Sequence, residues 1–514
     1  MNVYEVIAFV TYFILVLGVG IYFFVKSKDK TEKDYFLGGR NMNGWVSALS
    51  AGASDMSAWV LMGLPGAIFI KGLSQIWISI GLIIGTICAW FLIAPRLRRY
   101  AIKANDSITI PQFLSNRFKS VKSTLRIACA VIFVVGYCLY SASSVVACGK
   151  LFNMLVPSVK EDVAMIVMSV VIVSYTLLGG FKAVCWTDFF QGMLMLLALL
   201  TVPIVACIIL NVSGGATNVV TPENYYNVLA SGEFNWESVA SILTGLGWGL
   251  GYMGMPHILV RYMAVKSDKE MRKSQIIGSV WTTIILIMAT VVALVAHEFI
   301  GTSLSEEDKN LVFVVVVRKI FGVGALALLG GVLISAIVAA SMITADSQLL
   351  ASSSAFASDI YKTTINKKAT DKQMLWVGRI AVGAITIFAL AIALLVYYFD
   401  LGSIMELVSA AWSIFGAAFG PTIVLALFWK RFNEKGAVYG IISGFVVSIL
   451  WMVLFNFEYY GFESLIANTN IYEIIPGFVA SLLIATIVSL LTKAPSKEVV
   501  ALYESVNDKT IEAE

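Results

Sequence analysis

Charge is scarce in this chain of 514 residues, of which 13% are charged and 59% hydrophobic. Soluble domains carry about 25% charged residues, and the mean hydropathy here is +0.86. The sequence also contains no basic stripe and no sequence-specific nucleic-acid motif, so a nucleic-acid partner is not expected. The composition predicts an all-α polytopic protein whose core is built inside a lipid bilayer.

Metal ligands and nucleophiles are few as well. The chain has two histidines, His257 and His297, and six cysteines, none of them in a CxxC pair. Two separate histidines do not build a His-rich metal site, and the cysteines fit small buried apolar positions. A membrane enzyme needs a nucleophile, a base or a metal cluster, and the sequence offers none. We therefore predict a protein that is not an enzyme and has no enzymatic cofactor.

Long apolar runs dominate what is present. Runs of about 20 residues, each enough to cross a bilayer, recur thirteen times. They lie near 4–25, 45–70, 73–95, 124–154, 161–178, 184–211, 237–258, 275–298, 324–355, 375–398, 403–429, 436–456 and 472–492. The sequence predicts one transmembrane domain over 1–492 and a short charged tail over 493–514, which we expect to be a solvated helix or coil.

Positive charge is scarce in alternate loops, with Lys309, Arg318 and Lys319 as exceptions that we place on an external amphipathic segment. Clusters of Lys and Arg follow the first, third, seventh, ninth and eleventh runs, whereas residues 211–236 and 457–471 contain neither. Positive loops stay in the cytoplasm, so we expect the N-terminus outside and the C-terminus inside a bacterial cytoplasmic membrane. An odd number of spans requires the same arrangement.

Two of the apolar runs are interrupted. The second contains "LSAGASDMSAWVLMGLPG", in which Asp55 lies among glycine and serines. A carboxylate near the bilayer centre costs about 2.5–3.5 kcal/mol on insertion scales. The seventh contains "TGLGWGLGYMGMPHIL", with five glycines between Gly245 and Gly254 ahead of Pro256. Each glycine weakens a helix by about 1 kcal/mol, which favours unwinding or very close packing.

The spacing of the two interruptions suggests a repeat. Irregular backbone is tolerated at membrane depth only where it is buried or lines a cavity. Interrupted helices at corresponding places in two halves indicate a transporter site. The second and seventh spans are five apart, and because five is an odd number, two five-span units have opposite orientation. We therefore predict inverted repeats at about 45–211 and 237–429. The alternative is a pair of kinked packing helices without a site.

Oxygen atoms and small residues mark the ninth run, "AIVAASMITADSQLLASSS". Sodium is a hard cation that prefers oxygen ligands, and unwound helices supply free carbonyls. We expect carbonyls near Ala53 and Met56 to face Ala340 and Thr344 across a sodium ion, with Asp55 as nearby charge. The alternative is a packing face whose hydroxyls bond the carbonyl four residues back.

Asp188 and three aromatic residues are further candidates. Asp188 is either an intramembrane acid or a near-interface charge paired with Lys182. Tyr140, Trp248 and Tyr252 are each compatible with simple packing. Together with two broken helices they are expected to line a small amphipathic pocket.

Six motifs, in order along nearly the whole chain, resemble the bacterial sodium/proline symporters of the solute:sodium symporter family, which have a leucine-transporter-type core. They are "YFLGGR" (35–40), "ALSAGASDMSAWVLMGLPGA" (48–67), "GGFKAVCWTD" (179–188), "GWGLGYMGMPHILVRYMA" (247–264), "FGAAFGP" (415–421) and "YEIIPGF" (472–478). The resemblance implies sodium-coupled uptake of L-proline by alternating access, with Na+ as the coupling ion.

The resemblance also assigns residues. The sodium site it implies uses Ala53, Asp55, Met56, Ala340 and Thr344. The proline site it implies uses Ser57, Tyr140, Trp248, Tyr252 and Pro256. Arg40 matches a functionally sensitive cytoplasmic position. Asp188, Asp346 and Ser347 occupy positions where some relatives hold a second sodium.

Two departures from the family pattern bear on these assignments. Ile343 stands where the family usually has a serine, which removes one sodium hydroxyl, and Ser341 should point elsewhere on its helix. Ala58 replaces a glycine common in the proline branch, next to the expected solute contact. The alternatives are a sodium symporter for another small amino acid or carboxylate, and a transporter-like membrane sensor, which would need a long signalling domain.

Overall fold

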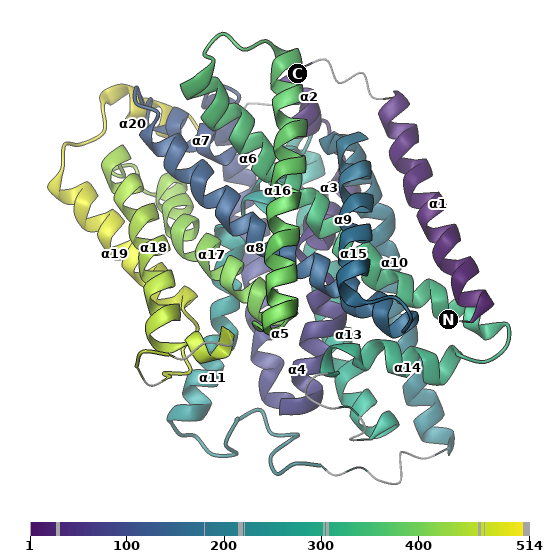
Figure 1. The fold of residues 1–514 in the computed structure, drawn as a ribbon. Coiled ribbons are helices and arrows are strands. Elements are labelled where there is room, and N and C mark those ends of the chain that lie inside the picture. Colours follow the sequence, from purple (N-terminus) through teal and green to yellow (C-terminus); the bar gives the residue numbers. More distant parts are fainter. Residues whose placement is uncertain are drawn as a thin grey trace.

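The computed structural model describes residues 2–26, 31–178, 180–213, 219, 221–301, 304, 308–460, 464–466 and 468–506. Over these residues the chain is helical and forms no β-strand, only an isolated bridge between Met42 and Val265. The long helices run roughly side by side as a bundle (Figure 1). The predicted all-α membrane fold is confirmed.

Each of the thirteen apolar runs lies on a helix or a broken helix. The continuous ones are α1 (Val3–Lys26), α8 (Thr124–Leu155), α9 (Glu161–Leu178), α10 (Phe181–Ser213), α13 (Asp268–Ile300), α16 (Asp371–Phe399), α17 (Ile404–Phe428), α18 (Glu434–Phe455) and α19 (Ile474–Leu491). α5 (Ile76–Cys88) continues through η4 (Ala89–Ile93) into α6 (Ala94–Lys103), and α15 (Leu326–Ala355) into η7 (Phe356–Ile365).

The second and seventh runs are broken, as predicted. The second consists of α3 (Gly44–Asp55), η2 (Trp59–Gly63) and α4 (Leu64–Lys71), with a bend of 60° at the break. The seventh consists of α11 (Trp236–Gly247), η5 (Trp248–Met253) and α12 (Pro256–Met263). By length and hydropathy, ten helices of the described chain qualify as spans, or eleven with the bent pair. The count of thirteen, which also needs α9 and the α11–η5–α12 segment, stays a prediction.

Short helices occupy the two ends of the bundle. They are α2 (Glu32–Leu37), η1 (Gly38–Arg40), η3 (Leu73–Gln75), α7 (Ile110–Arg117), η6 (Lys309–Leu311), α14 (Val312–Phe321), η8 (Phe457–Tyr460) and α20 (Lys497–Ser505). Polar residues fix several starting points. Asn43 caps α3, Asn235 caps α11 and Ser267 caps α13, each accepting a backbone N–H bond that satisfies an otherwise orphan donor.

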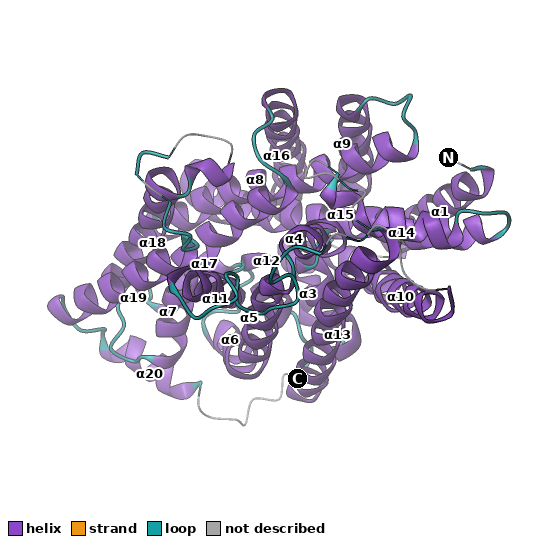
Figure 2. Cartoon of the chain, turned by 90° about the horizontal axis from the view of Figure 1, so that it is seen from below, coloured by secondary structure: helices purple, strands orange, loops and turns teal. Residues whose placement is uncertain are grey.

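The core of the bundle is formed by α3, α8, α12, α15 and α17, most of whose residues are buried. In the view along the bundle, α1 and α19 lie at opposite edges and α16 at a third (Figure 2). The outer helices expose large apolar side chains such as Ile14, Phe388 and Leu483. Such faces suit contact with lipid tails.

Glycines bring α5 and the seventh run into backbone contact. A Cβ added at Gly81 would lie 2.4 Å from the Gly245 carbonyl oxygen, and one at Gly85 would lie 2.3 Å from that of Gly249. A Cβ at Gly249 would in turn lie 2.2 Å from the Gly81 oxygen. The glycine run therefore serves close helix packing as well as the break, which is how small residues act between membrane helices.

Gly85→Ala should destabilise the protein, because the new methyl group would clash with backbone atoms of Gly249, which cannot move aside as a side chain could. Overpacking of this kind costs about 1–3 kcal/mol. Gly383→Ala on α16 is the matched control, since a Cβ there meets nothing within 4 Å. Thermal unfolding of the detergent-purified variants should give a lower midpoint for Gly85→Ala alone; equal midpoints would contradict the close approach.

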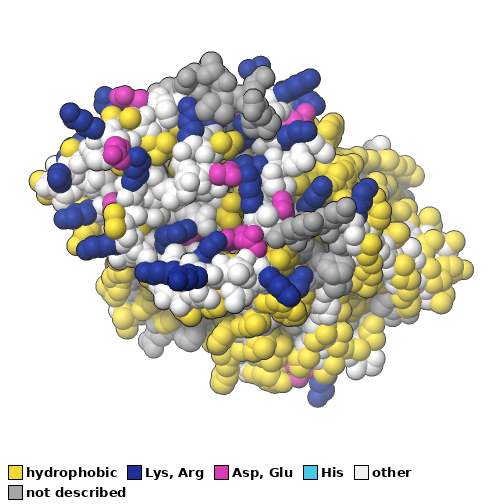
Figure 3. Space-filling view, turned by 90° about the horizontal axis from the view of Figure 1, so that it is seen from above, with side chains coloured by type: hydrophobic (Ala, Val, Ile, Leu, Met, Phe, Trp, Pro, Cys, Tyr) yellow, Lys and Arg dark blue, Asp and Glu magenta, His cyan; other side chains and the backbone are white. Residues whose placement is uncertain are grey.

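Lys and Arg side chains gather on one end of the bundle (Figure 3), the end at which α6, α7 and α20 lie (Figure 1). α20 lies there as a helix in which only Val499 is buried, and its Tyr503 side chain contacts the bundle. The Tyr503 ring lies 5.0 Å from the Arg96 guanidinium, 5.3 Å from that of Arg117 and 6.3 Å from the Tyr100 ring. Residues 507–514 of the tail lie outside the described residues.

Candidate functional site

The break in the second run releases two specific carbonyl groups. The Ser57 N–H donates to the Asp55 carbonyl at 2.8 Å, and the Val60 N–H donates to the Ser57 carbonyl at 3.1 Å. In a continuous α-helix these two N–H groups would instead donate to residues 53 and 56. The turn therefore frees the carbonyls of Ala53 and Met56, the two that the sequence nominated as sodium ligands.

α15 packs against α3 and presents an unusual hydroxyl. Ala340 and Thr344 are fully buried and lie one helical turn apart, hence on one face. Ser335 and Ser341 donate to carbonyls four residues back, at 2.7 and 3.0 Å. The Thr344 hydroxyl, by contrast, finds no hydrogen-bond partner in the described chain. An unpaired buried polar group costs about 1–3 kcal/mol, so this oxygen suits a ligand that the chain itself does not provide.

Two predicted residues from two other elements contact Asp55, whose carboxylate is fully buried. Its Oδ2 accepts a hydrogen bond from the Tyr252 hydroxyl of η5. Its main-chain carbonyl accepts from the Tyr140 hydroxyl of α8 at 3.2 Å and from the Trp59 indole at 3.1 Å. Asp55 Oδ1 has no partner among the described residues, which leaves one carboxylate oxygen available inside the bundle.

Aromatic rings form a layer beside Asp55. Trp248 lies 6.1 Å from Trp59 and 6.3 Å from Trp412, and Tyr252 meets Trp412 edge-on at 5.3 Å between ring centroids. The Trp412 indole donates to the Trp248 carbonyl at 2.8 Å. Sequence reasoning missed Trp59 and Trp412. Trp59 was findable, because it lies two positions after Ser57 within the interrupted stretch.

Two other predicted solute contacts lie at the breaks themselves. The Ser57 hydroxyl accepts the Trp59 N–H at 3.4 Å, and Ser57 is almost completely buried. Pro256 is the first residue of α12, where its missing N–H is harmless. The structure gives neither of them a contact with the Asp55 carboxylate, so their part in solute binding stays a prediction.

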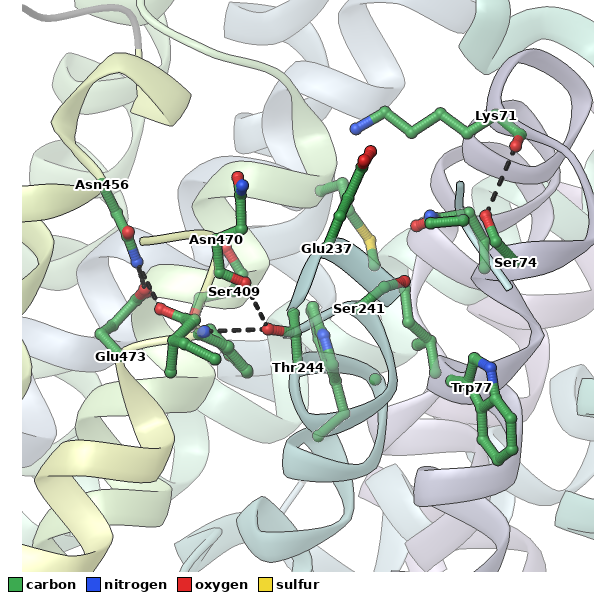
Figure 4. A pocket seen from close by; sticks show the side chains of 18 of the residues that line it. Lys71, Ser74, Trp77, Glu237, Ser241, Thr244, Ser409, Asn456, Asn470 and Glu473 are labelled. Carbon is green, nitrogen blue, oxygen red and sulfur yellow. Dashed lines mark hydrogen bonds between the residues drawn. The ribbon is translucent and has the colours of Figure 1, made fainter. Parts of the chain in front are cut away.

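A cavity of about 510 Å³ reaches the aromatic layer from the end of the bundle opposite α20. It lies between α11, α17, the start of α5 and the residues before α19 (Figure 4). Trp248 and Tyr472, stacked at 5.1 Å, both line it. Its lining includes polar residues, among them Lys71, Glu237 and Asn470. The cavity therefore extends from this side of the bundle to Trp248.

Asp188 lies inside the helix bundle. It is fully buried, and its ion-pair partner is Arg261 at 2.9 Å rather than Lys182. The Arg261 guanidinium also donates to the Ser347 hydroxyl at 2.5 Å, and Ser347 donates to Asp346 at 3.2 Å. The structure thus brings Asp188, Asp346 and Ser347 together, around an arginine that sequence reasoning missed although it stands in the motif "PHILVR".

Arg40 lies at the Lys- and Arg-rich end, away from Asp55. Its guanidinium donates to Asp106 at 2.7 Å, to the Met263 carbonyl at 2.6 Å and to the Ser107 carbonyl. Lys33 also donates to Asp106. Burial raises the pKa of Asp106, but the hydrogen bonds from Lys33 and Arg40 outweigh it and hold the pKa below its ordinary value of 3.8. The carboxylate is therefore ionised at neutral pH.

Arg98 of α6 binds the loop between α12 and α13. Its guanidinium donates to the Val265 carbonyl at 2.6 Å, to the Lys266 carbonyl at 2.7 Å and to Asp268 at 2.7 Å. Met42 pairs with the same loop, since Lys266 N–H donates to its carbonyl at 2.9 Å. Arg40 and Arg98 thus both donate to main-chain carbonyls at or just after the end of α12.

Two interrupted helices that meet around a buried carboxylate, inside a bundle of apolar spans, define a secondary transporter. The chain belongs to the sodium:solute symporter family, whose model matches residues 35–444. Similar curated proteins include the osmoregulated proline transporter OpuE of Bacillus subtilis (strain 168), 39% identical over 98% of each chain. The high-affinity proline transporter PutP of the same organism is 40% identical over 95% of this chain and 98% of its own.

A third curated protein is similar in sequence, and two solved structures are similar in fold. The sodium/proline symporter of Staphylococcus aureus (strain JH9) is 38% identical over 97% of this chain and 94% of its own. A Na+-coupled sialic acid symporter has a similar fold, with a TM-score of 0.75 at 20% identity over 96% and 99% of the two chains. The nucleobase-cation symporter MHP1 gives 0.52 at 12% identity over 92% and 98%.

Proposed function

We propose that this protein couples inward sodium flow to the uptake of L-proline. The observation that carries the proposal is the turn at residues 56–57, which frees two carbonyls inside the bundle beside a buried carboxylate and an aromatic layer. Full-length relatives named as proline transporters supply the solute. One sodium moving through 100 mV contributes about 2.3 kcal/mol, enough for roughly fifty-fold accumulation.

The coupling sodium is assigned to the space between α3 and α15. The Ala53 and Met56 carbonyls, the Ala340 carbonyl and the Thr344 hydroxyl are all hard oxygen ligands. Asp55 adds negative charge and links the ion to Tyr252 of η5. Sodium binding therefore stabilises one arrangement of both broken helices.

Proline is assigned to the adjoining aromatic layer. A five-membered ring fits against Trp248 and Tyr252, and its carboxylate suits the free N–H groups at a helix break. Tyr140, Ser57 and Pro256 complete the pocket in this proposal. Ala58, fully buried at the break, sets its width, and another small amino acid or carboxylate is the alternative solute.

The cavity side is proposed as external and the Lys- and Arg-rich side as cytoplasmic, with the N-terminus outside and the C-terminus inside. Inverted repeats at about 45–211 and 237–429 provide the two halves that rock during transport. In this proposal the cavity that reaches Trp248 is the external route, and the hydrogen bonds of Arg40 and Arg98 hold the inner end shut; the cavity lining and these hydrogen bonds support it.

Asp106→Asn should weaken the contacts of Arg40 and Lys33 at the proposed cytoplasmic end. Steady-state proline accumulation should then fall several-fold more than the initial uptake rate does. Because the pKa of Asp106 is lowered, its ion pairs stabilise the folded contact fully at pH values above the ordinary pKa of 3.8. This stabilisation is lost as the pH falls through the lowered pKa. Uptake should therefore show no titration of this pair between about pH 5 and 8. Glu498→Gln is the control, because its exposed pair with Lys119 contributes little.

Equilibrium binding tests the solute assignment. Labelled L-proline should bind the purified protein in sodium chloride and fail to bind in potassium chloride. Unlabelled alanine, betaine and pantothenate serve as competitors. Failure of proline to bind, with sodium-dependent binding of a competitor, would contradict the solute and leave the sodium site intact.

A further inference from the structure

A short segment before α19, residues 470–473, lines the cavity and is bound by neighbouring helices (Figure 4). The Thr244 hydroxyl of α11 donates to the Asn470 carbonyl at 2.8 Å. The Trp451 indole of α18 donates to the Ile471 carbonyl at 3.1 Å. Two helices thus fix the main chain of this segment at the edge of the cavity.

Tyr472 is held at both ends and stacks on Trp248. Its N–H donates to the Thr244 hydroxyl at 3.1 Å, and its own hydroxyl donates to the Ser409 carbonyl of α17 at 2.7 Å. The Tyr472 and Trp248 ring centroids are 5.1 Å apart, with 27° between the ring planes. Both side chains line the cavity, and Trp248 also lies 6.1 Å from Trp59 at the break in the second run. Trp248 therefore stands where the cavity meets the aromatic layer, with Tyr472 as its support.

The start of α19 packs against elements of the site, although α19 lies outside both proposed repeats. A Cβ added at Gly247 would lie 2.9 Å from the Ile475 side chain, and one at Gly416 would lie 2.5 Å from that of Ile474. Glycine at these two positions lets α19 approach the seventh run and α17 closely. The wall of the site that carries Tyr472 is therefore built by a helix that the repeats do not include.

We propose that Tyr472 is a positioning residue for solute selection, which holds the Trp248 ring at the outer wall of the proline pocket. This inference rests on the proposed function. A solute that enters from the cavity meets Trp248 before it reaches Tyr252 and Asp55. Stacked aromatic rings restrain each other, so Trp248 without Tyr472 is free to tilt toward the cavity. The pocket is then wider and selects less well for a five-membered ring. Tyr472 acts through Trp248 and is not itself a solute contact.

Tyr472→Leu should raise the proline concentration for half-maximal uptake about tenfold and leave the maximal rate within about twofold. It should also lower the preference for L-proline over the six-membered L-pipecolate at least about fivefold, measured as the ratio of the two uptake efficiencies. Tyr472→Phe keeps the ring and should keep the preference. A merely structural defect lowers the uptake of both solutes alike and does not change their ratio. An unchanged ratio in Tyr472→Leu, or an equal loss in Tyr472→Phe, would overturn the proposal.

Tyr225→Leu is the matched control. Tyr225 is likewise a buried tyrosine that donates to a carbonyl, that of Phe69 at 3.1 Å, and it stacks on His297 at 4.1 Å between ring centroids. It is not among the described residues that line the cavity, so its loss should leave the solute ratio unchanged. A change of ratio equal to that of Tyr472→Leu would count against the proposal. If Tyr472→Leu does not fold, Thr244→Val takes its place, because it removes the hydroxyl that holds Tyr472 from α11. Its ratio should fall about twofold or more, and an unchanged ratio would contradict the inference.

A second measurement needs no solute. Ser57 is 1% exposed and accepts the Trp59 N–H at 3.4 Å, which places it on the Trp59 side of Trp248. In Ser57→Cys, a water-soluble methanethiosulfonate should react several-fold faster once Tyr472→Leu is added, counted above the reaction of the same protein without the new cysteine. Adding Tyr472→Phe or Tyr225→Leu should not change the rate. Equal rates in all variants would contradict the role of Tyr472, whereas a wild type that shows these rates but binds no proline would contradict the proposed function.

Discussion

Asp55→Asn should reduce sodium-driven solute uptake at least about 100-fold, equivalent to about 2.8 kcal/mol. The substitution preserves shape but removes the charge from a fully buried group whose Oδ2 already accepts the Tyr252 hydroxyl. Without this carboxylate, no negative charge next to the released carbonyls of Ala53 and Met56 balances the positive charge of a sodium ion. Initial uptake rates at several sodium concentrations measure the effect, with protein abundance checked by immunoblot.

Tyr252→Phe is the matched control for that loss. It removes the hydrogen bond to Asp55 and keeps both the ring and the carboxylate. A hydrogen bond to a charged group contributes about 1.5–3 kcal/mol, so the uptake should fall by about tenfold and recover in part at high sodium. If Asp55→Asn and Tyr252→Phe lose activity equally, the charge of Asp55 is not what binds the ion.

Thr344→Val should raise the sodium concentration for half-maximal uptake by about 10- to 100-fold, which corresponds to about 1.4–2.8 kcal/mol of lost ion affinity. Without sodium, the same change should leave the free energy of unfolding unchanged or slightly higher. The Thr344 hydroxyl has no partner in the described part of the chain, and an unpaired buried hydroxyl is unfavourable. Opposite effects on ion affinity and on stability identify a ligand rather than a structural hydroxyl.

Two neighbouring hydroxyls provide the comparison. Thr344→Ser keeps the oxygen and should stay within a few-fold of wild type. Ser341→Ala removes a hydroxyl that already donates to the Ile337 carbonyl at 3.0 Å, so its sodium dependence should be unchanged. A normal sodium dependence in Thr344→Val would remove this residue from the ion site.

The positions of the two breaks were predictable from local chemistry. Asp55 among serines and five glycines ahead of Pro256 conflict with a continuous helix, and both helices end there. Carbonyls near Ala53 and Met56 were expected from the break, and the family resemblance implied the same two residues; the hydrogen bonds of Ser57 and Val60 now give the reason. The role of these groups in binding sodium stays a prediction.

Other features depend on contacts between distant segments. Arg261 looked like one more cationic residue at the end of a span, because nothing local indicates that Asp188, 73 residues away, faces it. Trp412 and Trp248 are 164 positions apart and meet only because α17 packs against η5. The packing of Tyr503 on Arg96 and Arg117 was hidden for the same reason, since a charged tail is usually solvated.

The most direct test of the account is uptake of labelled L-proline by proteoliposomes of the purified protein under an inward sodium gradient, with potassium and proton gradients as controls. The account predicts accumulation above the external concentration with sodium alone, enhanced by a negative interior and lost in Asp55→Asn. Proline accumulation driven equally by a proton gradient, or no response to sodium, would contradict the central claim that sodium at the α3 break drives transport.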